Sequence, residues 1–454
     1  MAHRRMATEA RISWSVNYRP RLAPRFVSLL LLSFTSMAAD RLPRHAVLGA
    51  SVMEKGGVRI SGIRAGSPAE RGGLRADDVI VSLDGREVQT PAEFVSRIKS
   101  EPVGRPVPFE IRRRGEEMSL NITLDAAPDE HDPQVDTFYE SILVDGALRR
   151  TLVTMPKGTA APRPAVLIVG GIGCYSIDNA TDPQDAYMRL AHDLGRRGFA
   201  ALRLEKSGVG DSQGPPCMTV DFVSEMHSYD IALRALQRDP RVDSRRVYLF
   251  GHSIGSLIAP RLANSGAVAG VIVAEAVGRN WIEYELWNMR RQLELAGDPP
   301  DQVDAKLAVK EVCMHRLLIE KQAEPVIETT EPACKDVNRY PAPASYLQQV
   351  AASNVAEPWT KLATPVLAIY GTGDFVTADA DHRRIVDIVN TRRPGEATLK
   401  LIEGMDHHLD AAGTPQEAYD MRVKQGRSGP YEERFSAAIL DWLCEREACV
   451  APGG

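Results

Sequence analysis

The sequence predicts an α/β protein in which a mostly parallel sheet, covered by helices, follows a smaller β-rich domain. Strand-like and helix-like segments alternate along residues 136–450, an order typical of a parallel sheet with helices on both faces. Residues 45–125 instead alternate short strands with turn signals around one helix-like segment. The length of 454 residues exceeds one typical domain, so two domains are expected.

The composition is that of an ordinary globular protein, with 44% hydrophobic and 25% charged residues. A net charge of −5, with no basic patch beyond the N-terminal region, argues against a nucleic-acid partner. No G-x-G-x-x-G sequence opens the first strand–helix unit of the second domain, so nicotinamide or flavin chemistry is not supported. The cysteines show no metal-type CxxC spacing either, and neither a cofactor nor a metal is expected.

Residues 1–39 are predicted to be a secretory signal peptide. An arginine-rich stretch precedes the apolar run 26–34, and small residues follow, so cleavage is expected near Ala38. The run is shorter than the roughly 20 residues that span a bilayer, so no stable membrane span is expected after cleavage. This predicts a periplasmic or secreted protein, with a retained membrane anchor as the alternative.

The six cysteines are an even number, as expected for a chain sent to an oxidising compartment. Proximity in the sequence suggests Cys313–Cys334 and Cys444–Cys449, which leaves Cys174–Cys217. Other pairings of six cysteines remain open at this point.

The first domain, residues 45–125, contains four strand-like segments and one helix-like segment, Pro91 to Lys99, with Thr90 as its N-cap. The strands are expected at Val58 to Ile63, Asp78 to Leu83, Val107 to Arg112 and Ser119 to Leu124. The stretch from Gly66 to Ile80, followed by Asp84-Gly85-Arg86, resembles a PDZ domain of the type attached to bacterial proteases.

The PDZ resemblance implies that this domain binds an extended peptide as an added strand and captures its free C-terminal carboxylate with backbone amides. The capturing loop would be Leu48-Gly49-Ala50, where Gly49 matches the glycine of the family. A PDZ fold retained as a spacer or dimerisation unit is the alternative. Residues 126–135 are polar, contain two prolines and are predicted to be a linker.

The second domain, residues 136–450, opens with a hairpin around Asp145-Gly146. Further strands are expected at Ala165 to Val169, Phe199 to Leu204, Val247 to Phe250, Val268 to Ala274, Val366 to Tyr370 and Ala397 to Ile402. Helices are expected at Asp185 to Arg197, Phe222 to Gln237 and Ser256 to Ala263.

A Gly-His-Ser-Ile-Gly sequence, residues 251–255, joins the buried strand at Val247 to Phe250 to the following helix. This strand, sharp turn and helix are typical of a nucleophile elbow, in which flanking glycines leave room for a strained serine. The helix N-terminus beside Ser253 favours a developing negative charge. Ser253 is therefore the predicted nucleophile; a glycine-rich turn with an idle serine is the alternative.

With this elbow on its fifth strand, the second domain resembles the α/β-hydrolase fold, in which catalytic groups follow the order nucleophile, acid, base. The resemblance places the acid at Asp374, in the turn Gly371 to Asp374, and the base at His407, after the last strand. A base makes the serine hydroxyl reactive, and a carboxylate orients the imidazole. His408 is the rival base, and Glu275, just after the sixth strand, is the rival acid.

The oxyanion hole is predicted to use the N–H of Ile254 and a second N–H from the loop that follows the third strand. This loop, Gly170 to Cys174, lacks the His-Gly start frequent in the family, so the second donor is ambiguous between Ile172, the first choice, and Gly171. The loop from Glu205 to Ser212 resembles a conserved loop of the family and is expected to be mainly structural.

Residues 278–358 exceed what the core fold requires and are predicted to be a lid over the active site, with a helix at Asp304 to Lys321. Trp281, Tyr284 and Trp287 are candidates to line a substrate pocket. Aromatic residues that merely anchor the lid are the alternative.

Together these features predict a serine hydrolase that cleaves carboxylic esters through an acyl-enzyme, with a PDZ domain for a peptide or protein partner. The first alternative is a serine peptidase that acts on peptides delivered by the PDZ domain. The second alternative, from a different class, is a PDZ adaptor with an inactive hydrolase fold.

Overall fold

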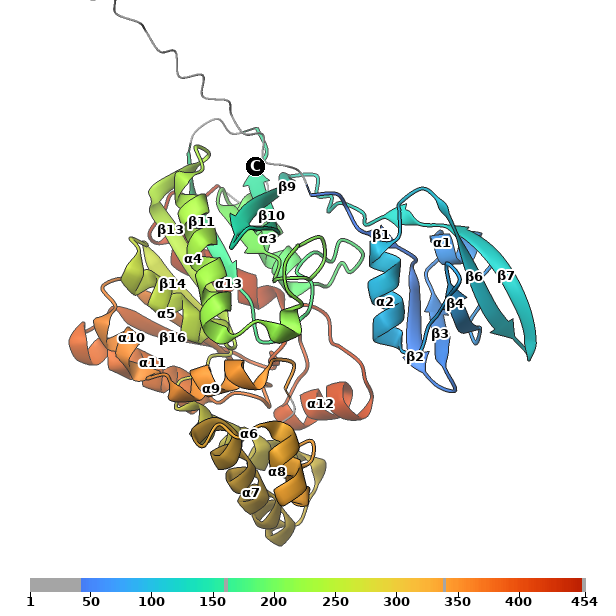
Figure 1. Cartoon of the computed structure of the whole chain (residues 1–454). Helices are drawn as coiled ribbons and strands as arrows, with labels where there is room; N and C mark the ends of the chain where they lie inside the picture. The colour runs from blue at the N-terminus through green and yellow to red at the C-terminus, as the bar shows by residue number, and fades with distance from the viewer. Residues whose placement is uncertain (1–41, 159–161, 338–339, 451–454) are drawn as a thin grey trace, which may run out of the picture. The chain divides into compact units, whose positions relative to one another are not determined.

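The computed structural model describes residues 42–158, 162–337 and 340–450 (Figure 1). The predicted signal peptide, with its cleavage point near Ala38, lies outside these residues. Among the residues described, no helix is long and apolar enough to cross a membrane.

The first domain is an antiparallel sheet with helix α2 (Pro91–Ser100) packed on it. The sheet contains β2 (Ala50–Glu54), β3 (Val58–Ile63), β4 (Val79–Leu83), β5 (Arg86–Glu87), β6 (Pro106–Arg113) and β7 (Glu116–Thr123). The short helix α1 (Pro68–Arg71) and the paired strands β1 (Ala46–Val47) and β8 (Asp125–Ala126) complete it. Thr90 caps α2 as predicted, accepting the N–H of Glu93 at 3.2 Å.

The second domain is an eight-stranded sheet in the order β16-β15-β14-β13-β11-β12-β10-β9. The strands are β9 (Val135–Val144), β10 (Ala147–Pro156), β11 (Arg163–Val169), β12 (Ala200–Leu204), β13 (Val242–His252), β14 (Gly270–Ala274), β15 (Val366–Gly371) and β16 (Ala397–Ile402). Only the pairings of β10 with β9 and β12 are antiparallel. The predicted fold class is confirmed, and the elbow follows the fifth strand, β13.

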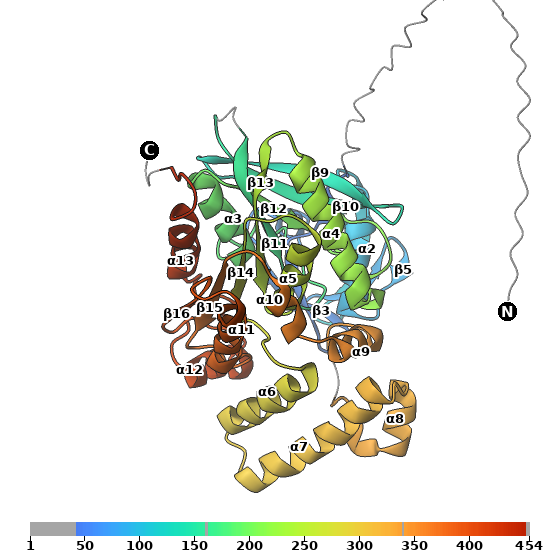
Figure 2. The ribbon, with the colours of Figure 1, turned by 90° about the vertical axis from the view of Figure 1, so that its left-hand side faces the viewer.

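Helices cover both faces of this sheet, as Figure 2 shows. On one face, α3 (Ala186–Arg196) and α13 (Glu433–Cys444) pack on side chains of the central strands. On the other face lie α4 (Phe222–Arg238), α5 (Gly255–Ser265), α10 (Ala356–Lys361) and α11 (Asp379–Arg392). Because both faces are covered, the central strands β11, β14 and β15 are nearly continuous apolar runs rather than alternating ones.

The predicted insertion is mostly helical, and its first three helices lie together, apart from the helices that cover the sheet (Figures 1 and 2). It contains α6 (Trp281–Ala296), α7 (Pro300–Met314), the π-helix η2 (His315–Ile319), α8 (Glu324–Thr330), the 3-10 turn η3 (Pro332–Cys334) and α9 (Ala344–Ala352). The prediction of one helix from Asp304 to Lys321 is wrong at both ends. Pro300 starts α7 four residues earlier because proline fits the first turn of a helix, and the regular helix ends at Met314.

The remaining short elements follow the strands of the second domain. They are the 3-10 turn η1 (Cys217–Thr219), the helix α12 (Pro415–Tyr419) and the π-helix η4 (Asp420–Lys424). The three predicted disulfides are all present: Cys174–Cys217, Cys313–Cys334 and Cys444–Cys449.

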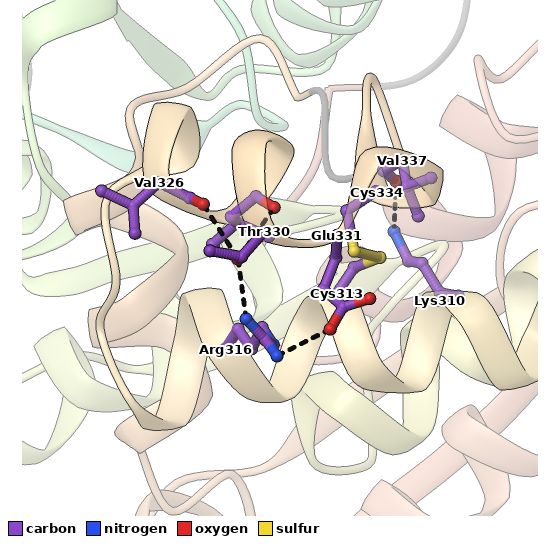
Figure 3. The surroundings of a disulfide bond; sticks show 9 residues. Lys310, Cys313, Arg316, Val326, Thr330, Glu331, Cys334 and Val337 are labelled. Atoms are coloured by element: carbon purple, nitrogen blue, oxygen red, sulfur yellow. Dashed lines mark hydrogen bonds and ion pairs between the residues drawn. A yellow bond between two sulfur atoms is a disulfide. The ribbon is translucent and has the colours of Figure 1, made fainter.

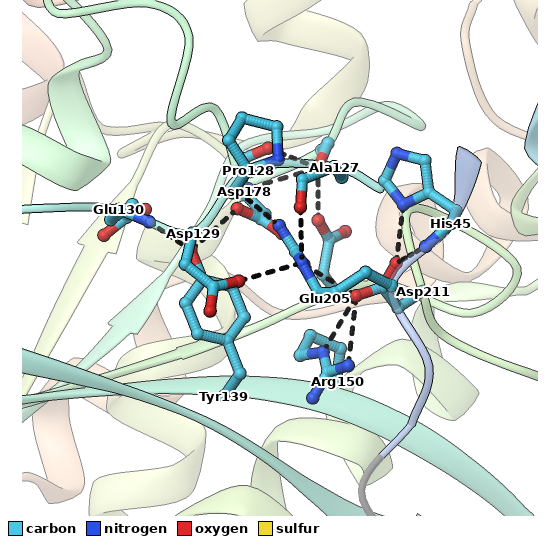
Figure 4. Close-up of polar contacts among 12 residues, drawn as sticks. His45, Ala127, Pro128, Asp129, Glu130, Tyr139, Arg150, Asp178, Glu205 and Asp211 are labelled. Carbon is cyan, nitrogen blue, oxygen red and sulfur yellow. Dashed lines mark hydrogen bonds and ion pairs between the residues drawn. The ribbon is translucent and has the colours of Figure 1, made fainter. Parts of the chain in front are cut away.

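The segment predicted to be a linker is held by buried ion pairs. Glu130 accepts two hydrogen bonds from Arg203, at 2.7 and 2.6 Å, and lies 3.2 Å from His192. Burial opposes ionisation of Glu130, but the charge of Arg203 and the hydrogen bonds from His192 and Arg203 outweigh it and lower its pKa to about 2. Figure 4 shows the neighbouring cluster, in which Asp211 accepts hydrogen bonds from His45 and Arg150.

Candidate active site

The turn between β13 and α5 holds Ser253 in a strained conformation, with φ at +54°. A Cβ added at Gly251 would lie 2.5 Å from the carbonyl oxygen of Gly255, and one added at Gly255 would lie 2.5 Å from that of Val169. Both positions therefore require glycine, as the elbow pattern predicted. The tight packing sets Ser253 at the N-terminus of α5.

Three predicted side chains from distant parts of the chain meet at the end of the sheet. His407, after β16, has its Nε2 atom 3.1 Å from Ser253 Oγ and its Nδ1 atom 3.0 Å from Asp374 Oδ2, after β15. A carboxylate only accepts, so Nδ1–H donates to Asp374 and bare Nε2 accepts from the serine hydroxyl. His408, the rival base, is exposed beside the pocket.

The carboxylate of Asp374 is fully buried and held in its ionised form by several donors. It accepts the N–H groups of Val376 and Thr377, at 2.5 and 3.0 Å, together with the Thr377 hydroxyl. Burial alone would raise its pKa, but His407 and these hydrogen bonds lower the pKa well below its ordinary value. Asp374 is thus ionised at neutral pH and can accept the hydrogen bond from His407 Nδ1–H.

The rival acid Glu275 lies behind Asp374 instead of at a separate site. It is fully buried after β14, and its Oε1 accepts the N–H of Gly371 at 2.7 Å. Burial, and then the adjacent charge and hydrogen bond of Asp374, raise the pKa of Glu275 well above its ordinary value. A protonated Glu275 therefore donates to the Asp374 carboxylate.

Among the described residues, one group of histidine and acidic side chains is close enough to share a metal ion: Glu275, Asp374 and His407, with ligand atoms within 4.8 Å of one another. Asp374 already serves both other members as a hydrogen-bond acceptor. Asp406 and Asp410, next to the base, both bind Arg422, at 2.9 and 2.6 Å.

The backbone amides near Ser253 differ in whether they already have partners. The N–H of Gly171 donates to the Tyr187 hydroxyl at 3.1 Å. Among the hydrogen bonds of the described residues, none uses the N–H of Ile172 or of Ile254. Ile172 and Ile254, which both line the cavity, therefore have amides available for a developing oxyanion.

The loop after β12 holds the loop that carries Gly171. Lys206, buried at the start of the Glu205–Ser212 stretch, donates to the carbonyl of Gly171 at 2.7 Å. The same ammonium lies 3.0 Å from Glu225 of α4 and 5.3 Å from the ring of Tyr175. The expected structural role of this stretch thus includes a direct contact with the active-site loop, which no motif in the sequence indicated.

A cavity of about 510 Å³ opens above Ser253 and His407, and its lining is mainly apolar. Trp281 and Tyr284, at the start of α6, line it as the aromatic pattern suggested. Trp287 does not; its ring lies between Arg279 and Arg291, at 5.5 and 5.2 Å. Two further residues of the insertion, Tyr340 and Pro341, also line the cavity, as does Val277, which directly precedes the insertion.

Buried polar contacts inside the insertion fix the position of Tyr340. Its hydroxyl donates to Glu285 at 2.6 Å, and Glu285 pairs with buried Lys310 at 3.1 Å. Figure 3 shows Lys310 reaching the carbonyl of Val337 at 3.0 Å, beside the disulfide between α7 and η3. The cavity wall formed by Tyr340 is therefore tied to α6 and α7.

The predicted peptide-binding loop of the first domain lines a groove between residues 45–50 and helix α2. Leu48, Gly49 and Ala50 line this groove together with Phe94 and Ile98 of α2. Gly49 has φ at +74°, and a Cβ there would lie 2.4 Å from that of Ser67. The loop thus has the backbone conformation that its glycine permits.

Each of the two domains matches a known protein family. Residues 46–124 match the PDZ domain family, and residues 161–410, just over half of the chain, match the family described as serine aminopeptidase, S33. Esterase EstD of Thermotoga maritima is 26% identical over 319 residues, which cover 70% of this chain and 69% of that esterase.

Two further similarities are more limited. The serine protease Do-like HtrA of Bacillus subtilis is 41% identical over 70 residues, which cover 15% of this chain and 16% of that protease. The solved structure of Est1E from Butyrivibrio proteoclasticus with ferulic acid covers 67% of this chain and 98% of its own, with a TM-score of 0.45 and 15% identity.

Proposed function

Because the chain belongs to the serine aminopeptidase S33 family and is a serine hydrolase with an N-terminal PDZ domain, we propose that it cleaves carboxylic esters through an acyl-enzyme. Ser253 is the nucleophile, His407 the general base and Asp374 the residue that orients and stabilises the imidazolium. The similarity to Esterase EstD over more than two thirds of both chains supports an ester as the substrate.

In the proposed mechanism, Ser253 Oγ attacks the ester carbonyl while His407 Nε2, 3.1 Å away, takes its proton. The amides of Ile172 and Ile254 stabilise the oxyanion of the tetrahedral intermediate. His407 then donates the proton to the leaving alcohol, and the acyl group stays on Ser253. Water, activated by His407, releases the acid in the second half of the reaction.

The cavity favours a neutral ester over a free peptide N-terminus. An aminopeptidase has to pair the protonated α-amine of its substrate with an acidic group. Among the described residues that line the cavity, Asp185 is the only acidic one, and its carboxylate already accepts from Met188 N–H and Asn179, at 2.8 and 2.7 Å. We therefore assign an uncharged acyl or alcohol group to the part of the cavity that Trp281 and Tyr340 line.

The observation that carries this proposal is the alignment of Ser253, His407 and Asp374 beside two unpaired amides in one apolar cavity. The test compares hydrolysis of short-chain nitrophenyl esters and peptide anilides by the mature protein. Ester turnover that Ser253→Ala and His407→Ala abolish supports the proposal. His408→Ala tests the rival base, and His227→Ala, at an exposed histidine of α4 outside the cavity, is the control. A preference for anilides would establish the peptidase, and rates equal to the Ser253→Ala background would leave the adaptor.

We further propose that the PDZ groove binds the free C-terminus of a peptide at Leu48, Gly49 and Ala50. A carboxylate fits there because the left-handed Gly49 lets successive amides face one point. Fluorescence anisotropy of an apolar-tailed peptide should show binding that C-terminal amidation removes. Equal binding of both peptides, or of neither, would favour the spacer role.

We propose that the protein acts outside the cytoplasm. Three disulfides join all six cysteines of the described residues, and such bonds persist in oxidising compartments. The signal peptide over residues 1–39 would direct this export, with cleavage near Ala38. Fractionation of producing cells, with mass analysis of the mature N-terminus, distinguishes a periplasmic or secreted form from a membrane-anchored one.

A further inference from the structure

A chain of hydrogen bonds runs between the two active-site loops without using any of the three proposed catalytic side chains. It begins at Gly171 of the oxyanion loop (residues 170–174), whose N–H lies 3.1 Å from the Tyr187 hydroxyl. Tyr187 Oη lies 2.7 Å from His252 Nδ1, and His252 Nε2 lies 2.8 Å from the backbone carbonyl oxygen of His407. Each of these bonds is buried.

The direction of each bond follows from donor chemistry. The carbonyl of His407 only accepts, so His252 carries its proton on Nε2. Burial lowers the pKa of His252 to about 3, so the ring is neutral and Nδ1 is a bare acceptor. Tyr187 therefore donates to His252, and burial raises its pKa to about 12, which keeps this proton in place. The lone pairs of Tyr187 remain to accept the N–H of Gly171.

We propose that Tyr187 and His252 act as one positioning unit, which holds the oxyanion loop and the backbone of the base in register for the reaction proposed above. The inference rests on that proposed function. The main observation behind it is that His252 directly precedes the nucleophile Ser253. This one residue therefore connects the elbow to the oxyanion loop, through Tyr187, and to the loop that carries His407.

The chain also explains which amide serves the oxyanion. Both polar groups of the Gly171 backbone are held: Tyr187 accepts its N–H, while Lys206 and Tyr175 donate to its carbonyl, at 2.7 and 3.1 Å. The carbonyl of Gly171 and the N–H of Ile172 belong to one peptide unit, so holding the carbonyl fixes that N–H, which is left for the cavity. Loss of the Tyr187 hydroxyl frees the preceding peptide unit, between Gly170 and Gly171, and removes the donor that orients His252.

The positioning role requires an effect on the chemical step and not on substrate binding. In Tyr187→Phe, kcat for a nitrophenyl ester should fall about 10-fold or more, because small misplacements of catalytic groups are costly, while KM stays within about twofold. His252→Gln, which has no atom in the place of Nδ1, should show the same split. Since both changes break one chain, the double variant should be no more than about twofold slower than the slower single variant.

The matched control is Tyr248→Phe, on the same strand as His252. The hydroxyl of Tyr248 donates to Glu447 at 2.6 Å, and the residue does not line the cavity. This variant should keep the wild-type kcat. Thermal unfolding of all variants should stay within about 3 °C of the wild type, and if Tyr187→Phe does not fold, His252→Gln decides the question.

The outcomes separate the two proposals. If the wild type is no faster than Ser253→Ala on any ester, the proposed function fails. If Ser253→Ala abolishes turnover but Tyr187→Phe matches the wild type, the positioning unit alone is rejected. It is also rejected if the effects of the two single variants multiply in the double variant, or if KM rises while kcat is unchanged.

Discussion

Glu275 gives the sharpest prediction about the electrostatics of the site, because it is a fully buried acid beside a charged one. We compare the wild type with Glu275→Gln. In the wild type, the Glu275 carboxyl group accepts the N–H of Gly371 at 2.7 Å. The side-chain oxygen of a glutamine can accept the same N–H, and its NH₂ group can donate to Asp374. Only the ability to ionise is removed, so the difference between the two proteins reports the titration of Glu275.

The expected sign and size follow from linkage between protonation and folding. The folded state holds the Glu275 proton more tightly than the unfolded chain, so stability is highest below the ordinary glutamate pKa of about 4.3 and falls as pH rises above it. Over each pH unit in which only the folded state keeps the Glu275 proton, the loss is about 1.4 kcal/mol. At about 2 °C per kcal/mol, the melting temperature of the wild type should fall by about 3 °C relative to Glu275→Gln over each such pH unit.

The assay is thermal unfolding of both proteins in matched buffers from pH 5 to pH 8. The control is Glu403→Gln, which removes the carboxyl group of an exposed glutamate after β16. A constant difference for Glu275→Gln, within about 1 °C, would refute the reasoning. It would mean that Glu275 is ionised beside Asp374 at neutral pH.

Three further outcomes follow from the geometry. Asp374→Asn should lower kcat by about 10³-fold or more, and a loss below tenfold in steady-state assays would show that another carboxylate serves the base. Replacing Cys174 and Cys217 by serine opens a bridge with a sequence separation of 43, so urea titration should show a loss of roughly 4 kcal/mol in unfolding free energy; an unchanged midpoint would contradict this. Tyr340→Ala should raise KM about tenfold for bulky acyl esters and by less than twofold for acetates, whereas equal effects on both would remove Tyr340 from the substrate pocket.

The parts of the site that were predictable from the sequence are those encoded by neighbouring residues. Gly251 and Gly255, two residues before and after Ser253, are both required by the same tight turn. The elbow can therefore be recognised from a sequence of five residues. Asp374 and His407 were identified through the resemblance to the α/β-hydrolase fold, because each lies in the loop that follows a strand, and the ends of parallel strands meet at one edge of a sheet. Thr90 could be predicted as an N-cap for the same reason, because its hydroxyl accepts the N–H of Glu93, only three residues further along the chain.

The parts that were missed depend on side chains that meet across the fold. Whether Gly171 or Ile172 offers a free amide depends on the Tyr187 hydroxyl, which already accepts the N–H of Gly171, and no sequence pattern links a tyrosine in α3 to that loop. Lys206 was missed because a lysine beside a glycine-rich turn is usually solvated, whereas here it is buried against Gly171.

Two of the three disulfides fasten the segments that frame the cavity, which ties the shape of the pocket to an oxidising environment. Cys174 ends the oxyanion loop, and Cys334 begins the segment that leads to Tyr340. Both segments lie outside the strands of the sheet, so ladder hydrogen bonds do not restrain their backbones, although Ile172, Cys334 and Tyr340 pack on the apolar core. Covalent bonds supply this restraint, and the cavity can therefore be preorganised without enlarging the hydrophobic core.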